Sequence, residues 1–208
     1  MSKNKVISDA VIKRLPRYYR MLKILENEGT VRVSSGSLAD MLNITASQVR
    51  QDFSNFGEFG QQGYGYTVSS LKAEIAGILG LDKPHDMIII GCGNIGTALA
   101  HYKGFTDDGF TVRAAFDVNP QVAAGLPEEV AFYTMDRLSE YVESHNVDIA
   151  IIATQKEVAL SVAEQLKSIG VNRIWNFAPT DISLSDSELV VENINMSDSL
   201  FVLSYKIK

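Results

Sequence analysis

The sequence contains few of the residues that build disulfides or metal centres. Its 208 residues include one cysteine, Cys92, which excludes an internal disulfide framework and is typical of a reducing compartment. The three histidines, His85, His101 and His145, show no ligand spacing with one another or with Cys92. We therefore expect no metal site, because bound metals need several converging ligands.

Long apolar runs are also missing. The longest strongly apolar stretches, "MIIIG" and "IAIIAT", are far shorter than the roughly 20 residues of a membrane-spanning helix. The first residues, "MSKNKVISDAV", include lysines but no apolar stretch of about 7–15 residues behind them, as a secretory signal would require. We therefore expect a cytoplasmic protein that does not enter a membrane.

Negative charge predominates overall but is unevenly distributed. The net charge is −6, yet residues 1–81 carry 10 Lys and Arg against 7 Asp and Glu, whereas residues 82–208 carry 9 against 18. A basic N-terminal part on an acidic body suits a polyanion-binding head on a globular regulator. The alternative is an ordinary solvated helix face. We expect two domains, residues 1–81 and residues 82–208.

The N-terminal part predicts a helix-turn-helix. Apolar residues recur at helical spacing over residues 8–28, where Pro16 marks either a break or the true first turn. A second helix is expected over residues 34–42 and a third from Thr45, where "TASQ" is a capping box. The two-residue link "NI" makes the turn tight. The third helix would then bury Val49, Phe53 and Phe56 and expose Ser47, Arg50, Gln51 and Ser54.

A wing is predicted to follow this helix. In "FGEFGQQGYGY" glycines alternate with aromatic residues, as expected of short strands joined by a tight turn. Residues 68–79 predict a connecting helix, and "GLDKPHD" predicts the linker to the second domain. The N-terminal domain is therefore expected to be a winged helix.

The second domain predicts an α/β fold of the Rossmann type. Continuous apolar strands alternate with helical segments, which implies a doubly wound parallel sheet with helices on both faces. A final helix over residues 197–208 carries an apolar stripe that needs a partner surface. The strands are expected at residues 87–90, 111–116, 130–133, 148–153, 173–177 and 189–191.

The segment "IIIGCGNIG" predicts a dinucleotide site. Gly91, Gly93 and Gly96 have G-x-G-x-x-G spacing directly after an apolar strand, where they would form a tight turn, approach a pyrophosphate and pack helix on strand. Asp117 ends the next strand, where its carboxylate would bind a ribose hydroxyl and favour NAD(H) over NADP(H). The alternative is a glycine turn without a ligand.

Two further readings concern reactive groups. Cys92 lies at a helix N-terminus, a position that can lower a thiol pKa, so a redox thiol is an alternative to a small structural residue. Tyr19 and Lys23 have the Tyr-x-x-x-Lys spacing of short-chain dehydrogenases, but they precede the Rossmann part, and the chain behind residue 81 leaves no room for a substrate domain. We expect no enzyme.

The chain as a whole resembles the Rex family of redox-sensing transcriptional repressors. The resemblance implies a homodimer with swapped C-terminal helices, from about residue 196, that binds palindromic double-stranded operator DNA when free or bound to NAD⁺. It implies release of the DNA when NADH binds. The matching motifs are "KRLPRYYR", "SSGSLADMLNITASQVRQDFSNFGEFG", "GYGY", "GCGNIGTALAHYKGF", "FDVNP", "NFAP" and "VENIN".

The resemblance also implies roles for individual residues, of which Arg50 is the best candidate for a bidentate guanine contact. The candidate DNA-binding residues are Lys5, Arg14, Arg17, Ser47, Arg50, Gln51, Ser54, Gln61 and Gln62. The candidate cofactor residues are Gly91, Cys92, Gly93, Asn94, Ile95, Gly96, Tyr102, Asp117, Thr154, Phe177 and Met196. Coupling between the domains would involve Arg20, Tyr102 and Asn195.

Several positions depart from the family pattern. Asn195 replaces an aspartate and cannot form an ion pair with Arg20, "RQD" replaces "RKD", and Gln61 and Gln62 replace a basic wing tip. Each lost phosphate contact weakens DNA binding at every sequence. A diverged paralogue with weak DNA binding or altered NADH coupling is therefore an alternative, and a nucleotide-binding enzyme subunit is another.

Overall fold

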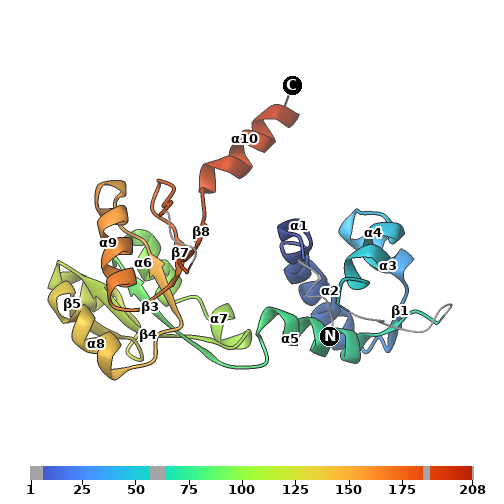
Figure 1. The fold of residues 1–208 in the computed structure, drawn as a ribbon, viewed down its shortest axis with the longest axis horizontal. Coiled ribbons are helices and arrows are strands. Elements are labelled where there is room, and N and C mark those ends of the chain that lie inside the picture. The colour runs from blue at the N-terminus through green and yellow to red at the C-terminus, as the bar shows by residue number, and fades with distance from the viewer. Residues whose placement is uncertain (1–6, 57–63, 185–187, 208) are drawn as a thin grey trace. The chain divides into compact units, whose positions relative to one another are not determined.

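The structure is a computed structural model that describes residues 7–56, 64–184 and 188–207. The chain divides into two compact units, Met1–Lys83 and Pro84–Lys208, so the boundary falls two residues beyond the predicted one (Figure 1). Three candidate DNA-binding residues, Lys5, Gln61 and Gln62, lie outside the described residues, as does the predicted tip of the wing.

The N-terminal unit begins with two helices where one was expected. Helix α1 spans Asp9–Ile12 and α2 spans Leu15–Asn27, with Pro16 in the first turn of α2. Proline fits there because the first N–H groups of a helix have no partner within the helix. Pro16 therefore starts the second helix and separates it from the first.

Helices α3, Ser35–Leu42, and α4, Ala46–Phe53, form the helix-turn-helix. Asn43, in the turn between them, adopts the left-handed conformation at φ 54°. The Thr45 side chain caps α4 by accepting the backbone N–H of Gln48 at 3.1 Å. The other half of the predicted capping box is replaced, because the Gln48 amide donates to Asp52 at 2.8 Å.

The described part of the wing is a two-stranded antiparallel sheet of β1, Arg32–Val33, and β2, Tyr66–Thr67. Gly65 has φ +69°, and a Cβ added there would lie 2.6 Å from the Val33 carbonyl oxygen, so the turn requires glycine. Helix α5, Val68–Leu79, does more than connect the units. It packs on α2 through the N-terminal core, and Lys72 forms an ion pair with Glu26 of α2.

The C-terminal unit is built on a six-stranded parallel sheet with strand order β5-β4-β3-β6-β7-β8. This order is that of the dinucleotide-binding Rossmann fold, in which ligands bind at the carboxyl ends of the central strands. The fold class predicted from the sequence is therefore confirmed. The strands are β3 His85–Ile90, β4 Phe110–Asp117, β5 Ala131–Thr134, β6 Ile149–Ile152, β7 Arg173–Asn176 and β8 Val190–Asn193.

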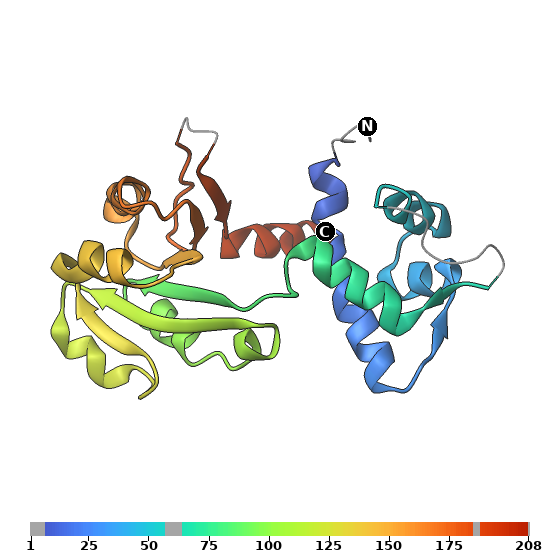
Figure 2. The ribbon, with the colours of Figure 1, turned by 60° about the horizontal axis from the view of Figure 1, so that its bottom comes forward.

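Two apolar layers cover the sheet, because successive strand residues point to opposite faces. Ile88 and Ile90 of β3 pack with α8 and α9, whereas Met87 and Ile89 pack with α6 on the other face. Figure 2 shows α8 and α9 on one side of the sheet and α6 on the other. Helix α7 and two 3₁₀ turns, Pro120–Gly125 and Met135–Arg137, were not expected, since segments so short carry no periodic pattern. The helices are α6 Asn94–Ala100, α7 Gly104–Asp107, α8 Leu138–Ser144 and α9 Lys156–Ser168.

The last helix, α10, spans Met196–Lys206 and buries none of its described residues. It leads away from β8, and apolar side chains along it are more than half exposed, including Leu200 at 62% and Phe201 at 69% (Figure 1). An apolar surface of this kind marks an interaction site. The structure thus bears out the apolar stripe predicted for this segment.

A buried amide pair holds the carboxyl edge of the sheet beside the last two strands. Asn176, which is fully buried, donates to the Thr180 carbonyl at 2.7 Å and to Asn193 Oδ1 at 2.8 Å, and its own oxygen accepts the Ala178 N–H. Asn193 in turn binds both backbone groups of Ile182. These bonds fix the loop that carries Phe177.

Replacing Asn176 by alanine should lower the free energy of unfolding of the C-terminal unit by about 2 kcal/mol, because buried partners lose their hydrogen bonds. Urea unfolding followed by the emission of Trp175, the one tryptophan, measures this at a fixed protein concentration. The exposed Asn146→Ala is the control and should change the midpoint little. Equal midpoints for the two variants would show that the amide pair does not stabilise the edge.

Candidate functional site

The three glycines of the loop between β3 and α6 meet different structural requirements. Gly91 has φ +95°, and a Cβ there would lie 2.8 Å from the Ala153 oxygen; a Cβ on Gly96 would lie 1.9 Å from the Gly91 oxygen. Gly93 faces open space, with nothing within 4 Å of an added Cβ. Gly91 and Gly96 are therefore required by the protein itself, whereas Gly93 keeps the outer side of the loop clear for a ligand.

An open groove of about 650 Å³ runs along this loop, between α6 and the 3₁₀ turn Pro120–Gly125. Its size and place, at the carboxyl edge of the sheet, suit the adenosine end of a dinucleotide. The candidate residues Ile95 and Gly96 are turned toward the protein, half-buried and buried, and Asn94 is exposed. The groove is lined by Cys92, Gly93, Asn94, Thr97, Ala98, His101, Gln121, Val122 and Gly125.

Asp117, at the end of β4, links the glycine loop to the segment that follows β4. Its carboxylate accepts the backbone N–H of Cys92 at 2.7 Å and that of Asn119 at 2.9 Å. A carboxylate has about four acceptor positions, so two remain for the hydroxyl groups of a ribose. Its negative charge would repel a phosphate on the same ribose. Asp117 thus holds the glycine loop and keeps acceptor capacity on the same carboxylate.

Cys92 contributes its backbone to the groove, while its thiol is buried in the core beneath it. Burial, together with the charge of Asp117, raises the pKa of the thiol to about 12. The thiolate is the nucleophile in thiol oxidation, so this pKa makes the side chain unreactive near neutral pH. The structure therefore does not support the redox-thiol alternative.

The other end of the candidate site is aromatic. Tyr102, Phe105, Trp175 and Phe177 form a row with successive ring centroids 4.8, 5.7 and 4.6 Å apart. Tyr102 is 59% exposed, and its ring lies over Gly104, where a Cβ would come within 2.7 Å of it. The structure thus brings the candidates Tyr102 and Phe177 into one row.

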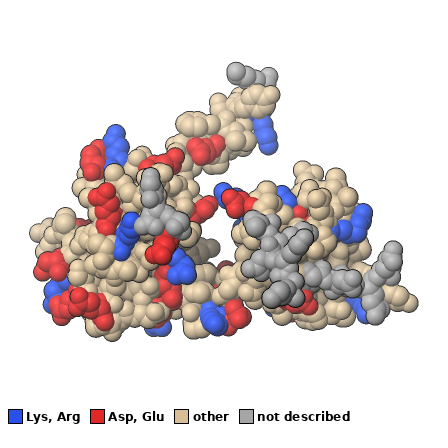
Figure 3. All heavy atoms as spheres, in the orientation of Figure 1, with Lys and Arg blue, Asp and Glu red and all other residues tan. Residues whose placement is uncertain are grey.

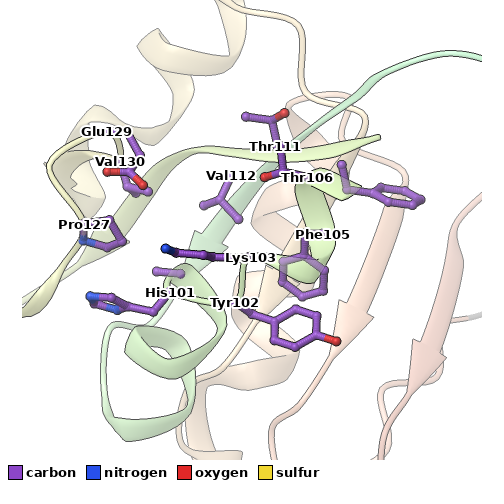
Figure 4. A pocket seen from close by; sticks show the side chains of 12 residues that line it. His101, Tyr102, Lys103, Phe105, Thr106, Thr111, Val112, Pro127, Glu129 and Val130 are labelled. Carbon is purple, nitrogen blue, oxygen red and sulfur yellow. The ribbon is translucent and has the colours of Figure 1, made fainter. Parts of the chain in front are cut away.

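A second, smaller hollow of about 130 Å³ lies beyond the end of α6. Figure 4 shows the Tyr102 ring against Phe105, with its hydroxyl directed away from the hollow between Lys103, Val112 and Pro127. Tyr102 therefore lines this hollow, but its hydroxyl points away from it.

Two further cofactor candidates follow the carboxyl ends of strands β6 and β8. Thr154 follows β6 beside the glycine loop, since its Cγ2 would be 3.0 Å from a Cβ on Gly91. Met196 begins α10, is 60% exposed and does not line the groove. Asn195 caps α10 by accepting the Ser197 N–H at 3.3 Å, a local role that its sequence position did not reveal.

In the N-terminal unit α4 presents the expected polar face. Val49 and Phe53 are buried, and the four candidates Ser47, Arg50, Gln51 and Ser54 are exposed. The guanidinium of Arg50 donates to the hydroxyl of Ser35, the first residue of α3, at 3.1 Å. An arginine held in this way at the centre of an exposed helix face is suited to read a base edge.

Arg14 has a partner inside the protein. Its guanidinium donates to both carboxylate oxygens of Asp52, each at 2.7 Å, and Tyr18 donates its hydroxyl to the same carboxylate at 2.8 Å. The structure therefore does not support the prediction that Arg14 holds a DNA phosphate. Arg17 remains a candidate, because it is exposed and gives one N–H to the Leu42 carbonyl at the end of α3.

Asp52 is a functional candidate that the sequence reasoning missed. Burial alone would raise the pKa of this carboxyl, but the hydrogen bonds from Arg14, Tyr18 and Gln48 outweigh burial and leave it below its ordinary value. Burial and the bond to Asp52 raise the pKa of Tyr18. The signal was present: a carboxylate stands on the inner face of α4, three residues after Val49 and next to Phe53.

Arg32 is a second candidate that was missed. It lies on the exposed side of β1, with its guanidinium 5.9 Å from the centre of the Tyr64 ring. The described part of the wing therefore carries a cation even though Gln61 and Gln62 replace the usual basic tip. Acidic side chains, by contrast, are spread over the C-terminal unit (Figure 3).

In the part of the chain that the structure describes, no three His, Cys, Asp or Glu side chains converge to hold a metal ion. Among the same residues, no helix combines the length and hydropathy needed to cross a bilayer.

Comparisons with known proteins cover both units. A family model described as "Putative DNA-binding protein N-terminus" matches residues 6–54, and one described as "CoA binding domain" matches residues 82–180. The chain is 44% identical to the "Redox-sensing transcriptional repressor Rex" of Clostridioides difficile strain 630, over 99% of this chain and 97% of that protein. It is 48% identical to the protein of the same name from Clostridium botulinum strain Hall, over 98% and 97% of the two chains.

Solved structures agree with these relatives. The crystal structure of RSP with β-NAD⁺ and operator DNA matches at a TM-score of 0.91 and 41% identity, covering 98% of this chain and 93% of RSP. The RSP complex with β-NADH matches at a TM-score of 0.88 and 38% identity, covering 98% and 95%. The named relatives are transcriptional repressors, which confirms the prediction that the chain is not an enzyme. This chain belongs to the Rex family of redox-sensing transcriptional repressors.

Proposed function

We propose that the protein binds a palindromic operator as a homodimer in the cytoplasm, reads the NADH/NAD⁺ ratio and leaves the DNA when NADH binds. The observation that carries the proposal is the combination, in one chain, of an open glycine loop with Asp117 beside it and an exposed α4 with Arg50 at its centre. The RSP complexes with operator DNA and with β-NADH support both halves.

On the cofactor side, the protein's own groups suit the two ends of NAD(H). The backbone around Gly93 leaves space for a pyrophosphate, and the free acceptor positions of Asp117 face ribose hydroxyl groups. The aromatic row that contains Tyr102 and Phe177 offers an apolar surface to the nicotinamide ring. An apolar surface penalises the cationic oxidised ring by desolvation and favours the neutral reduced ring. The reduced cofactor is therefore the one that such a surface selects.

On the DNA side, α4 enters the major groove, Arg50 reads a guanine, and Arg17 and Arg32 hold phosphates. The exposed apolar side chains of α10 supply the dimer contact. A two-fold dimer presents two recognition helices, so its operator is palindromic. Near-complete switching needs a cofactor affinity that differs by roughly 10⁴-fold between the two states of the dimer.

The test is fluorescence anisotropy on the operator duplex of the RSP complex, with NAD⁺ and NADH titrated separately. We expect release by NADH alone. An equal response to both forms would indicate the diverged paralogue instead, and no binding under any condition would exclude an operator-binding repressor.

The variant Gly93→Val tests whether the glycine loop is the place where NADH acts in this titration. Gly93 has φ −70° and open space beside it, so valine fits the backbone while its side chain occupies the proposed pyrophosphate position. The variant should bind the operator as the original protein does but resist release by NADH. Undiminished release would place the cofactor elsewhere.

A coupling between the units is expected at Asn195. Aspartate caps a helix as well as asparagine does, so Asn195→Asp should leave α10 intact while adding a charge for Arg20. Operator affinity without NADH should rise about 2- to 5-fold, the range of an exposed ion pair. The gain in operator affinity should vanish when Arg20→Gln is added. A gain that persists in the double variant would show that it does not come from an ion pair with Arg20.

Redox sensing is expected not to involve oxidation of the Cys92 thiol. Because the pKa of Cys92 is raised to about 12, little thiolate is present at pH 8, and reaction with a thiol-specific disulfide reagent should be slow in the folded protein. The same reaction in urea should be fast, since the free thiol has a pKa of about 8.5. Equal rates in the two conditions would restore the redox-thiol alternative.

A further inference from the structure

The cluster around Asp52 joins the recognition helix to the helix behind it. The carboxylate is fully buried and accepts four hydrogen bonds from three side chains. Arg14 directly precedes α2 and Tyr18 lies one turn into that helix, whereas Gln48 belongs to α4 itself. No buried polar side-chain atom of the described residues lacks a hydrogen-bond partner, so the buried polar atoms of this cluster are all paired.

Stability alone does not account for this arrangement. Asp52 is fully buried and the Arg14 side chain is 25% exposed, so the carboxylate loses its hydration and the guanidinium loses much of its own. Well-packed apolar residues of similar size are often as stable as a buried ion pair or more so. The neighbouring core already has apolar contacts from Val49 and Phe53, with Phe53 4.9 Å from the Tyr18 ring. Apolar contacts are not directional. Hydrogen bonds at 2.7 to 2.8 Å weaken steeply when their angles change, and so they resist rotation of α4 about its axis.

Rotation of α4 matters because its opposite face carries the base-reading candidates. Asp52 is buried, while Arg50 and Gln51, directly before it, are exposed. With side chains a helix is about 10–12 Å in diameter, so a rotation of about 20° moves a group at its surface by about 2 Å. A shift of this size breaks a bidentate contact with a base. It does not move Arg17 and Arg32, the proposed phosphate contacts, because they belong to α2 and β1 rather than to α4.

We propose that Asp52 is a positioning residue for sequence recognition: bound by Arg14 and Tyr18, it sets the rotation of α4 so that Arg50 and Gln51 meet their bases. The inference rests on the proposed operator binding and deepens it. It predicts a separation of two affinities, since the cluster should govern discrimination between operator and unrelated DNA while leaving the phosphate-driven affinity unchanged.

The test is the double variant Arg14→Met/Asp52→Leu, which removes one charge of each sign and replaces the cluster by apolar side chains. Anisotropy is measured on the RSP operator duplex and on a scrambled duplex of equal length and composition, over a range of salt concentrations. We expect the operator Kd to rise about 10- to 100-fold, the loss of a bidentate base contact. The scrambled-duplex Kd and its salt slope should change less than about 2-fold.

The control is Arg137→Met/Glu140→Leu, which removes another bidentate arginine–carboxylate pair, exposed on the C-terminal unit. It should leave both affinities unchanged. Thermal unfolding of every variant separates positioning from general destabilisation. If the double variant unfolds, Tyr18→Phe replaces it, which keeps the ion pair but removes one bond to Asp52; a smaller loss on the operator alone is then expected.

Two results would overturn the inference. The first is unchanged discrimination in the variant that folds. The second is an equal loss on both duplexes, which is what a merely structural cluster would produce. If the original protein itself fails to distinguish operator from scrambled DNA, the proposed function fails, and the inference falls with it.

Discussion

Between β3 and α6 the backbone passes closer to itself than any side chain allows. Gly96 stands where a Cβ would be 1.9 Å from the Gly91 oxygen, and Gly91 stands where a Cβ would be 2.8 Å from the oxygen of Ala153, the residue directly after β6. This close approach sets the start of α6 against the carboxyl edge of the sheet. The groove, the position of Asp117 and the burial of Cys92 all follow from it.

Both units use a carboxylate to fix an element whose placement matters for binding. Asp117 accepts two backbone N–H groups and holds the glycine loop, while Asp52 accepts hydrogen bonds from three side chains and holds α4. The difference lies in exposure. Asp117 is half-buried and keeps free acceptor positions, whereas Asp52 is fully buried and has partners inside the protein. One carboxylate therefore remains open to a further partner, and the other lies behind the exposed face of α4.

The sequence predicted what depends on local pattern. The alternation of apolar strands and helices, the glycine spacing and the cap at Thr45 are local, and the structure has them where they were expected. Strand β1 has two residues and α7 four, which is too short for any periodicity.

Contacts between residues far apart in the chain could not be predicted from local sequence patterns. Arg14 resembles a DNA-binding cation when only charge is counted, because its partner Asp52 is 38 residues away. The inner-face position of Asp52 signalled a buried carboxylate but not which cation would neutralise it. For Asn195 the opposite holds: the family resemblance implied a distant partner, Arg20, whereas its side chain caps the adjacent helix α10.

The exposed apolar face of α10 has a consequence for how much protein a cell needs. In the proposed homodimer, this helix ties the DNA-binding form to the concentration of a second copy, by mass action, because its apolar side chains are uncovered within the described residues. Dilution acts on the same equilibrium. Under that proposal the dose of the repressor enters its response alongside the redox state, and a cell that makes less of it loses operator occupancy more than proportionally.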